Sequence, residues 1–303
     1  MNIKILFTKS FPLLLITIFF LSCTTFPQAG YGQDLPASFS SITSIVPQWQ
    51  PLAEGVSYFH GKIESPRIEF WSLQIDLLSP NIEIVVRSGG ANTESNRPTS
   101  TKVSSFVRDN NLIAGINTVP FDISTSREGQ PIMNMGIVVS GGVLLSSANS
   151  RYDALVFYKD KRAEIVNQSA IRSIENIENA VGGFYQILIN GEPSQRTLNN
   201  ETRHPRSTAG ISDDGRYLYL LVIDGRRAAS IGCTENETAL LLLQLGSNNG
   251  INFDGGGSSA LVIRFPDESI RPVNMPVHGN LPGTERAVAG CLGIRIINPS
   301  REK

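Results

Sequence analysis

The feature that most constrains the fold is a strand, a helix and a second strand in succession between residues 217 and 253. Residues 217–223 are almost wholly apolar, which is typical of a strand covered on both faces. Thr234 and Glu237 have the spacing of a capping box and predict the start of a helix, which Gly246 is suited to end. The leucine-rich residues between them predict that this helix is buried.

An acidic residue follows each of these two strands. The right-handed crossover makes the strands parallel, so both end on one edge of the sheet, even when another strand lies between them. Asp224 and Asp254 are therefore expected on the same side of the sheet, where open sheets bind ligands. Two close carboxylates can serve as acid and base or nucleophile, or can hold a divalent cation. The alternative is that both Asp-Gly pairs only make turns.

Three glycines and two serines follow Asp254. Ordering three glycines is entropically unfavourable, and such a run is useful where the backbone bends sharply or approaches a ligand closely. Backbone N–H groups can form an anion-binding nest, to which serine hydroxyls add donors. A flexible linker is the alternative, but this run lies between two apolar strands. The sequence therefore predicts a ligand-binding loop made of Gly255, Gly256, Gly257, Ser258 and Ser259.

A second polar cluster lies upstream, at residues 203–210. Arg206 is the expected phosphate ligand, because a planar guanidinium matches two phosphate oxygens at once. Ser207 and Thr208 are expected to donate hydrogen bonds beside it. Arg203 and His204 are interpreted as incidental charge on a solvated loop.

Shorter elements are expected through the rest of the chain. Apolar alternation in residues 68–86, broken at 79–81, predicts two strands, and residues 103–109 predict a short exposed helix. Glycines flanked by apolar runs predict a β-hairpin over residues 137–145. Further strands are expected at residues 112–117, 155–158, 163–166, 185–190 and 260–264.

The first residues have the order of a secretion signal. Basic residues precede an apolar run, residues 11–21, that is about half the ~20 residues needed to cross a bilayer. Phe20-Leu21-Ser22-Cys23 resembles the lipobox of bacterial lipoproteins, in which a lipidated Cys23 would attach the chain to a membrane. Ordinary cleavage nearby is the alternative. Either way, the chain is expected to be exported to the periplasm or cell envelope.

The chain is expected to have three parts. They are a signal peptide or lipoprotein signal at residues 1–22, a flexible tether rich in Ser, Thr, Pro and Gln at residues 23–50, and one domain at residues 51–303. The formal net charge of -1 argues against a nucleic-acid partner. Cys233 and Cys291 either form a disulfide or serve as small buried hydrophobes.

Several of these residues stand in the order and spacing of a known family. The most specific mark is Asp-Gly-Gly-Gly-Ser-Ser at residues 254–259, preceded by Asn252 and Phe253. With the other matching segments, it resembles the phosphodiester glycosidase family over about residues 180–293. Those segments are Arg206-Ser207-Thr208-Ala209-Gly210, Val222-Ile223-Asp224-Gly225-Arg226, Ser230-Ile231-Gly232, Thr234 with Glu237, and Glu285-Arg286-Ala287-Val288.

The match is weaker in the N-terminal half. The family's Asn-Gly-Gly-x-Phe element appears here as residues 117–122, Asn-Thr-Val-Pro-Phe-Asp, which keep the Asn and Phe and lack both glycines. Near the C-terminus, residues 289–291 replace an asparagine-containing run of the family. Both departures bear on the identity of the substrate.

The resemblance implies an α+β fold with mixed twisted β-sheets and buried helices, among them the C-terminal strand–helix–strand unit. It implies cleavage of the sugar C1–O bond of a sugar-1-phosphodiester, which leaves a phosphomonoester. Arg206 would hold the phosphate, and Asp254 and Asp224 would supply acid or base roles. The implied partner is a glycan or sugar-phosphate substrate, and the implied pocket residues are Asn117, Asp122, Asn252, Ser258 and Arg286.

Two other readings remain open at this point. Ser258 or Ser259 would be a nucleophile if a histidine activated it, but the three histidines sit in unrelated sequence contexts. A non-catalytic envelope module that binds glycan or phosphate-containing polymers is the alternative from another class. The sequence leaves open the sugar, the group beyond the phosphate, metal dependence and the oligomeric state.

Overall fold

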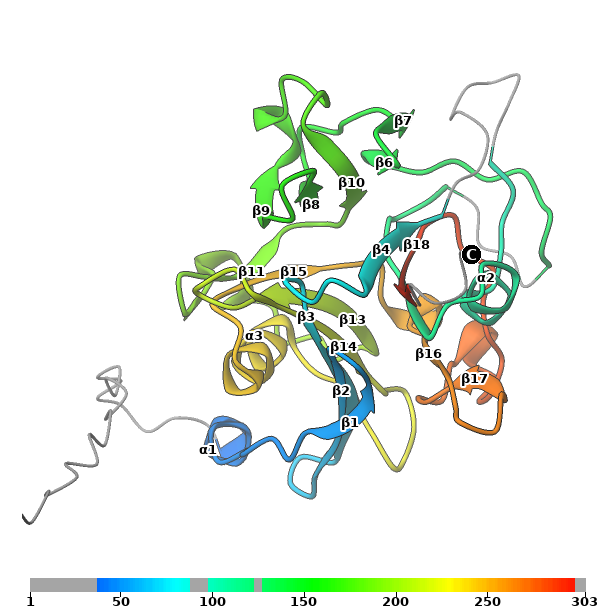
Figure 1. Cartoon of the computed structure of the whole chain (residues 1–303). Coiled ribbons are helices and arrows are strands. Elements are labelled where there is room, and N and C mark those ends of the chain that lie inside the picture. The colour runs from blue at the N-terminus through cyan, green and yellow to red at the C-terminus, as the bar shows by residue number, and fades with distance from the viewer. Residues whose placement is uncertain (1–36, 88–97, 123–126, 298–303) are drawn as a thin grey trace, which may run out of the picture. The chain divides into compact units, whose positions relative to one another are not determined.

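A computed structural model describes residues 37–87, 98–122 and 127–297, which form three β-sheets and a few short helices (Figure 1). Within these ranges, every strand pairing in the three sheets is antiparallel. The expected α+β fold is confirmed. The expected signal sequence lies outside the described residues.

The largest sheet has eight strands. Their order is β1 (Gln50–Ala53), β2 (Val56–Ile63), β3 (Ile68–Asp76), β14 (Tyr217–Ile223), β13 (Arg206–Ile211), β15 (Asn249–Asn252), β11 (Gln186–Ile189) and β12 (Glu192–Pro193). The helix α3 (Glu235–Leu245) connects β14 to β15, and β13 lies between these strands, antiparallel to both. Strands β14 and β15 therefore run parallel, and their carboxyl ends lie on one edge of the sheet, as the crossover predicts.

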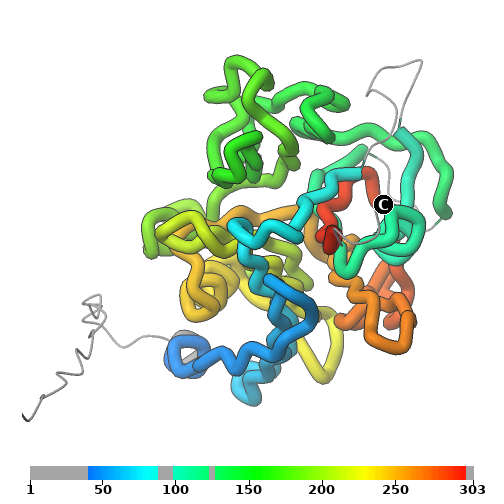
Figure 2. The backbone as a smooth tube through the Cα atoms, viewed as in Figure 1, coloured from blue at the N-terminus to red at the C-terminus, as the bar shows by residue number. Residues whose placement is uncertain are grey.

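Two sheets of five strands complete the fold. One has the order β7 (Val143–Ser146), β6 (Val138–Ser140), β10 (Ile177–Gly182), β8 (Asp153–Tyr158) and β9 (Ala163–Asn167). The other has the order β17 (Ile270–Pro272), β16 (Leu261–Arg264), β5 (Ala114–Asn117), β18 (Cys291–Ile296) and β4 (Ile82–Val86). Strands β4 and β18 are distant in sequence yet pair directly, as the cyan and red segments of Figure 2 show.

The α3 helix begins and ends as its sequence predicts. The Thr234 hydroxyl accepts from the Glu237 N–H at 3.1 Å, and the Glu237 carboxylate accepts from the Thr234 N–H at 3.0 Å. Gly246 ends the helix with φ of 112°, a conformation that glycine adopts without strain. The helix buries its leucines against the face of the large sheet that carries Phe70 and Leu221.

Two expectations about the shorter elements are wrong. The helix α2 (Val103–Asp109) is not an exposed helix, because Val103, Phe106 and Val107 are buried in a core cluster with strand residues of the third sheet. The tether does not extend through residues 37–50, since α1 (Ala37–Thr43) packs against α3 and Ile42 is fully buried.

The described residues also contain short 3₁₀ turns. These are η1 (Gln168–Ala170), η2 (Gln195–Thr197), η3 (Gly256–Ser258) and η4 (His278–Asn280).

The second face of the large sheet packs into a core shared by all three sheets. This core joins Leu220 of β14, Ile116 of β5 and Leu155 of β8. None of the helices in the described ranges has the length and apolar character that a membrane-crossing helix needs.

Candidate active site

At the edge of the sheet where β14 and β15 end, the residues that follow β15 hydrogen-bond to the start of β13. Gly256 N–H donates to the Pro205 carbonyl at 2.8 Å, and Phe253 N–H donates to the Ser207 carbonyl at 2.9 Å. The loop of residues 254–259, here called the glycine loop, therefore lies against the first residues of β13. Alternation along β13 then sends neighbouring side chains to opposite faces of the sheet.

Asn117 fixes the glycine loop from β5. Its Nδ2 donates to the Asp254 carbonyl at 2.6 Å, while its Oδ1 accepts from Ser207 Oγ at 2.7 Å and from the Ala260 N–H at 3.1 Å. The Asp254 N–H also donates to the Thr118 carbonyl at 2.9 Å. Asn117 and Ser207, both expected to bind substrate, are thus fully engaged in holding the loop in place.

Asp254 brings a carboxyl to the glycine loop. The residue is partly exposed, as are Gly255 and Gly256, and its carboxyl hydrogen-bonds the buried Ser258 hydroxyl. Burial raises the pKa of Asp254 to about 6, although the Ser258 hydrogen bond and the charge of Arg286 act in the opposite direction. At neutral pH this carboxyl is mostly ionised and still basic enough to accept a proton.

Arg286 brings a guanidinium to the same loop. Its Nη1 donates to Ser258 Oγ at 3.0 Å, and its Nε donates to His278 Nδ1 at 2.9 Å. A Cβ at Gly257 would lie only 2.5 Å from Arg286 Nη2. Glycine at this position is therefore what allows the guanidinium to lie directly against the backbone.

Arg226 brings a second guanidinium. A Cβ at Gly256 would lie 3.0 Å from Arg226 Nη2, so this side chain also lies over the glycine loop. Arg226 is exposed and has φ of 57°, a conformation that is uncommon for residues other than glycine and that clusters at functional sites. Among the described residues, none forms a hydrogen bond or ion pair with its guanidinium.

Arg226 and Arg286 are close enough for the charge of Arg226 to affect the pKa of Arg286. The pKa of Arg286 is lowered chiefly by burial, and the positive charge of Arg226 acts in the same direction. The pKa of His204 is likewise lowered by burial first and then by Arg206 and Arg226. An exposed cationic surface next to a glycine-rich backbone is suited to bind an anion.

Asp224 does not share this opening, contrary to expectation. Its side chain is 0% exposed and pairs with Arg227. Its Oδ1 accepts from the Met275 N–H at 2.9 Å and from Asn274 Nδ2 at 3.4 Å, and burial raises its pKa to about 6. Asp224 therefore ties the end of β14 to residues 274–275 and does not reach a ligand in this arrangement.

The Arg206 side chain does not face the glycine loop either. Its Nε donates to the Cys233 carbonyl at 3.1 Å, its Nη2 to the Thr202 carbonyl at 3.0 Å, and its Nη1 lies 3.4 Å from Glu235 Oε1. Because Arg206 and Ser207 are neighbours on a strand, they point to opposite faces, and Arg206 points toward α3. The expectation that it holds a phosphate beside Asp254 is not met.

Thr208 and Asn252 share the α3 side with Arg206. They are cross-strand partners, and Asn252 Nδ2 approaches Glu235 Oε1 at 3.5 Å. Tyr185 donates to the other oxygen of Glu235 at 2.6 Å. The buried network on this face is therefore centred on Glu235.

The structure also bears on the expectations for Asp122, Arg203, the two cysteines and a metal site. Asp122 is exposed, and its Oδ1 accepts from the Met133 N–H at 2.8 Å. Arg203 is not a loosely solvated charge, because it pairs with the buried Glu237 of α3. Cys233 and Cys291 are buried free thiols, and no disulfide joins them. Within the described ranges, no group of three or more His, Cys, Asp and Glu side chains is arranged to hold a metal ion.

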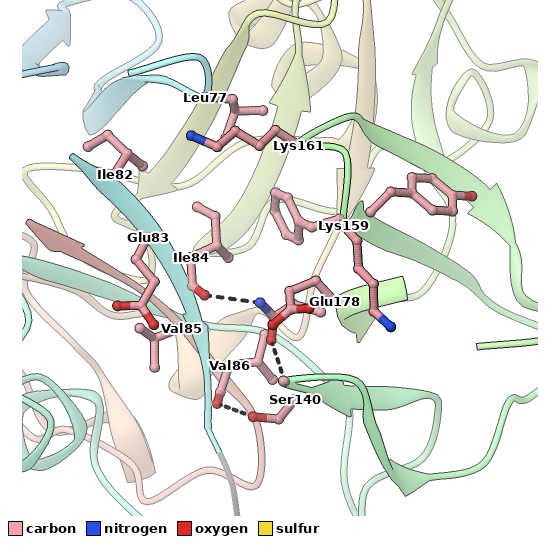
Figure 3. A pocket seen from close by; sticks show the side chains of 14 residues that line it. Leu77, Ile82, Glu83, Ile84, Val85, Val86, Ser140, Lys159, Lys161 and Glu178 are labelled. Atoms are coloured by element: carbon pink, nitrogen blue, oxygen red, sulfur yellow. Dashed lines mark hydrogen bonds between the residues drawn. The ribbon is translucent and has the colours of Figure 1, made fainter. Parts of the chain in front are cut away.

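Two pockets lie elsewhere on the described chain. One, of about 360 Å³, lies between β4 and the second sheet (Figure 3), and the other, of about 600 Å³, lies between α1 and β2. In the first, Asn179 Nδ2 donates to the Ile84 carbonyl at 3.0 Å and Ser140 Oγ to the Val86 carbonyl at 2.9 Å. β4 lies at the edge of its sheet, and these bonds satisfy two of its backbone carbonyls that no neighbouring strand pairs. None of the expected site residues lines either pocket.

The sequence did not predict two of the residues that lie at this site. Arg226 directly follows an Asp-Gly pair of the family pattern, which was the available signal, but its left-handed backbone was not foreseeable. His278 has no local signal, since only the fold of residues 275–284 brings it to Arg286. The open site thus consists of Asp254, the glycine loop, Arg226, Arg286 and His278.

A carboxyl of raised pKa beside two guanidinium groups and a glycine-rich backbone characterises an enzyme that acts on an anionic substrate. The family model described as phosphodiester glycosidase matches residues 110–295. This is more than half of the chain, which therefore belongs to the phosphodiester glycosidase family, a family of hydrolases. A search of curated proteins found no significant match.

Solved structures with the same fold include three informative neighbours. The catalytic domain of zebrafish N-acetylglucosamine-1-phosphodiester alpha-N-acetylglucosaminidase, auto-inhibited by its pro-peptide, matches with a TM-score of 0.59 and 20% identity, over 82% of this chain and 85% of that one. A hypothetical protein from Synechocystis matches with a TM-score of 0.56 and 14% identity, over 84% and 64%. A protein of Burkholderia pseudomallei matches with a TM-score of 0.53 and 14% identity, over 76% and 74%. At these identities the likeness concerns the fold.

Proposed function

We propose that this enzyme hydrolyses sugar-1-phosphodiesters, breaking the bond between sugar C1 and the phosphate oxygen and releasing a phosphomonoester. The observation that carries the proposal is the Asp254 carboxyl beside Arg286, at a glycine loop over which Arg226 also lies. Family membership supports the reaction class. Water supplies the new oxygen on C1, and the phosphate oxygen leaves with the bonding electrons.

The phosphate is assigned to Arg226 and Arg286 in place of Arg206. Two guanidinium groups over adjacent glycines repel each other, and an anion between them would relieve that repulsion. Arg286 is held in orientation by Ser258 and His278, whereas no residue in the described part of the chain occupies the donors of Arg226. Both groups would stabilise the charge that develops on the departing phosphate.

Asp254 is assigned the role of base. A phosphate held by two arginines departs without being protonated, so the chemistry needs a group that activates water more than it needs an acid. Within the described residues, Asp254 is the carboxyl that belongs to this loop, and its pKa of about 6 suits proton transfer near neutral pH. A single carboxylate that activates water inverts the configuration at C1.

The test is a release assay on the purified chain from residue 24 onward, with N-acetylglucosamine-1-phosphate methyl ester as the first substrate. We expect free sugar and methyl phosphate from the wild type, and a loss of about 10³-fold or more in Asp254→Ala and Arg286→Ala. The matched control is His60→Asn, on β2, where the histidine contacts Glu69 and Trp71. Binding without turnover across a panel of sugars would point to a binding module instead.

Two further measurements complete this test. Proton NMR of the first anomer released distinguishes inversion from retention, and retention would reassign Asp254 from base to nucleophile. The same assay with a chelator tests the divalent cation that the two carboxylates suggested. Activity that disappears with the chelator and returns with a metal would contradict the metal-free route.

The proposed location is the bacterial cell envelope. The order of basic residues, apolar run and Cys23 supports export, and these residues lie outside the described ranges. The glycan substrate proposed here fits such a location. Mass analysis of the mature N-terminus distinguishes a lipidated Cys23 from ordinary cleavage, and a mature chain that retains residues 1–22 would contradict export through this signal.

A further inference from the structure

The contact between Arg286 and His278 fixes the protonation state of the imidazole. Arg286 Nε donates to His278 Nδ1 at 2.9 Å, and an arginine has no acceptor and stays protonated in proteins. His278 Nδ1 must therefore be the acceptor, so the ring is neutral and carries its proton on Nε2. This contact can exist only while His278 is unprotonated.

We propose that His278 is a positioning residue, whose neutral imidazole orients Arg286 so that the site can bind a phosphodiester. The proposal rests on the proposed function for the identity of the anion. It assigns His278 no contact with the reacting atoms. Its consequence is that one proton on His278 weakens the binding of the anion.

The geometry leaves Arg286 little freedom. Nε is held by His278, Nη1 by Ser258, and Nη2 lies against Gly257. Ser258 in turn hydrogen-bonds the Asp254 carboxyl. One chain of contacts thus runs from His278 through Arg286 and Ser258 to Asp254. The orientation of the Arg286 guanidinium therefore depends on His278 Nδ1, the acceptor at one end of this chain.

The groups that face His278 decide the direction of the pH effect. The pKa of His278 is lowered by burial and then by Arg286, and the η3 turn of the glycine loop packs against η4, which His278 begins. Arg226 adds positive charge beside Arg286, and the nearest carboxyl in this chain of contacts, Asp254, is separated from His278 by Ser258 and Arg286. Protonation would place a second positive charge and an N–H against Arg286 Nε, which breaks the contact.

The first experiment measures binding of diethyl phosphate, an unreactive diester that stays singly charged from about pH 5 to pH 8. All proteins in this experiment carry Asp254→Asn, because protonation of Asp254 near pH 6 would itself favour binding of an anion. With His278 otherwise unchanged, we expect the affinity to be constant near neutral pH and to fall by up to about tenfold per pH unit below the pKa of His278. In His278→Asn, the amide oxygen replaces Nδ1 as the acceptor and does not titrate. This variant is expected to bind within about threefold of the Asp254→Asn protein near neutral pH and to lack the fall at low pH.

His278→Phe removes the acceptor and is expected to bind about tenfold or more weakly at every pH. The control His60→Asn is expected to keep the affinity and pH dependence of the Asp254→Asn protein. The proposal is overturned if His278→Asn keeps the fall at low pH, if His278→Phe binds as the Asp254→Asn protein does at neutral pH, or if the Asp254→Asn protein binds no diester at any pH.

A spectroscopic measurement tests the protonation state in the wild-type protein. Nitrogen-15 shifts of the His278 ring should show an unprotonated Nδ1 and a protonated Nε2 near neutral pH, and a proton on Nδ1 there overturns the proposal. These measurements need no turnover, so they separate the two ideas. Normal diester binding with the expected tautomer but no sugar release would contradict the hydrolase and leave the role of His278 standing.

Discussion

The Arg206 guanidinium and the Glu235 carboxylate lie 3.4 Å apart, and both side chains are only 6% exposed. This buried ion pair joins the first residue of β13 to the first residue of α3. Carbonyls of Cys233 and Thr202 accept the other Arg206 donors. The arginine with the clearest family signal therefore stabilises the scaffold under the site, while Arg226 and Arg286 are presented at the loop.

Replacing Arg206 should affect stability rather than substrate binding. Arg206→Met leaves the Glu235 carboxylate buried without its partner, and the expected loss of unfolding free energy is about 3–5 kcal/mol. Arg206→Met with Glu235→Gln should recover much of that loss, because the buried charge is removed from both sides. Urea denaturation of the two variants measures the difference. A stable Arg206→Met protein with only a raised KM would contradict the structural role.

Arg226→Ala should affect substrate binding rather than stability. The guanidinium is exposed and no described residue pairs with it, so the free energy of unfolding should change by no more than about 0.5 kcal/mol. If Arg226 binds the phosphate, kcat/KM for a sugar-1-phosphodiester should fall about a hundredfold. Arg172→Ala, at another exposed arginine, is the matched control and should leave both quantities unchanged. Equal kinetics for the two variants would remove Arg226 from the site.

Gly257→Ala tests the close approach of Arg286. The backbone of Gly257 is not in the left-handed region, so alanine brings no backbone strain, but its Cβ would lie 2.5 Å from Arg286 Nη2. The guanidinium must move, and kcat/KM should fall about tenfold. In an Arg286→Ala background, the same substitution should have almost no further effect. Additive losses in the double variant would show that the alanine acts through something other than Arg286.

Asp254→Asn should make the protein more stable at neutral pH while abolishing turnover. The pKa of Asp254 is about 6 in the folded chain, above the unfolded value of 3.8, so ionisation disfavours the fold. That difference corresponds to at most about 3 kcal/mol. The wild-type contribution is full below about pH 4 and is lost as the pH rises through about 6.

Denaturation of both proteins at several pH values checks this expectation. The stability gained by Asp254→Asn should be largest at pH 7 and should vanish near pH 4, where the wild-type carboxyl is protonated in both states. A gain that is independent of pH would show that burial of the charge is not its cause.

Elements governed by nearby residues were predictable from the sequence. The Thr234 capping box, the Gly246 helix end and the apolar strand β14 all depend on contacts within a few residues, and the structure has each where the pattern places it. The shared edge of β14 and β15 followed from the handedness of the crossover. The insertion of β13 between them did not, because strand order depends on contacts between distant segments.

The direction of the Arg206 side chain shows why the site was only partly predictable. All six residues of β13 are buried, so no alternation of polar and apolar residues marks which side faces the loop. A segment that resembled a polar loop is in fact a central strand. The expected loop residues Gly255 to Ser258 and Arg286 do come together, while Arg226 and His278 join them only through tertiary contacts. Asp224 was placed on the correct edge, but its burial under residues 274–275 has no local signal.

Several hydrogen bonds hold the glycine loop to its neighbours, among them Asn117 Nδ2 to the Asp254 carbonyl, Asp254 N–H to the Thr118 carbonyl, and Gly256 N–H to the Pro205 carbonyl. A run of three glycines would otherwise sample many shapes, and here that freedom is lost when the chain folds. The glycine loop is therefore already ordered before a ligand binds. Association should then be a single kinetic step, with an observed rate that rises linearly with ligand concentration and reaches no plateau.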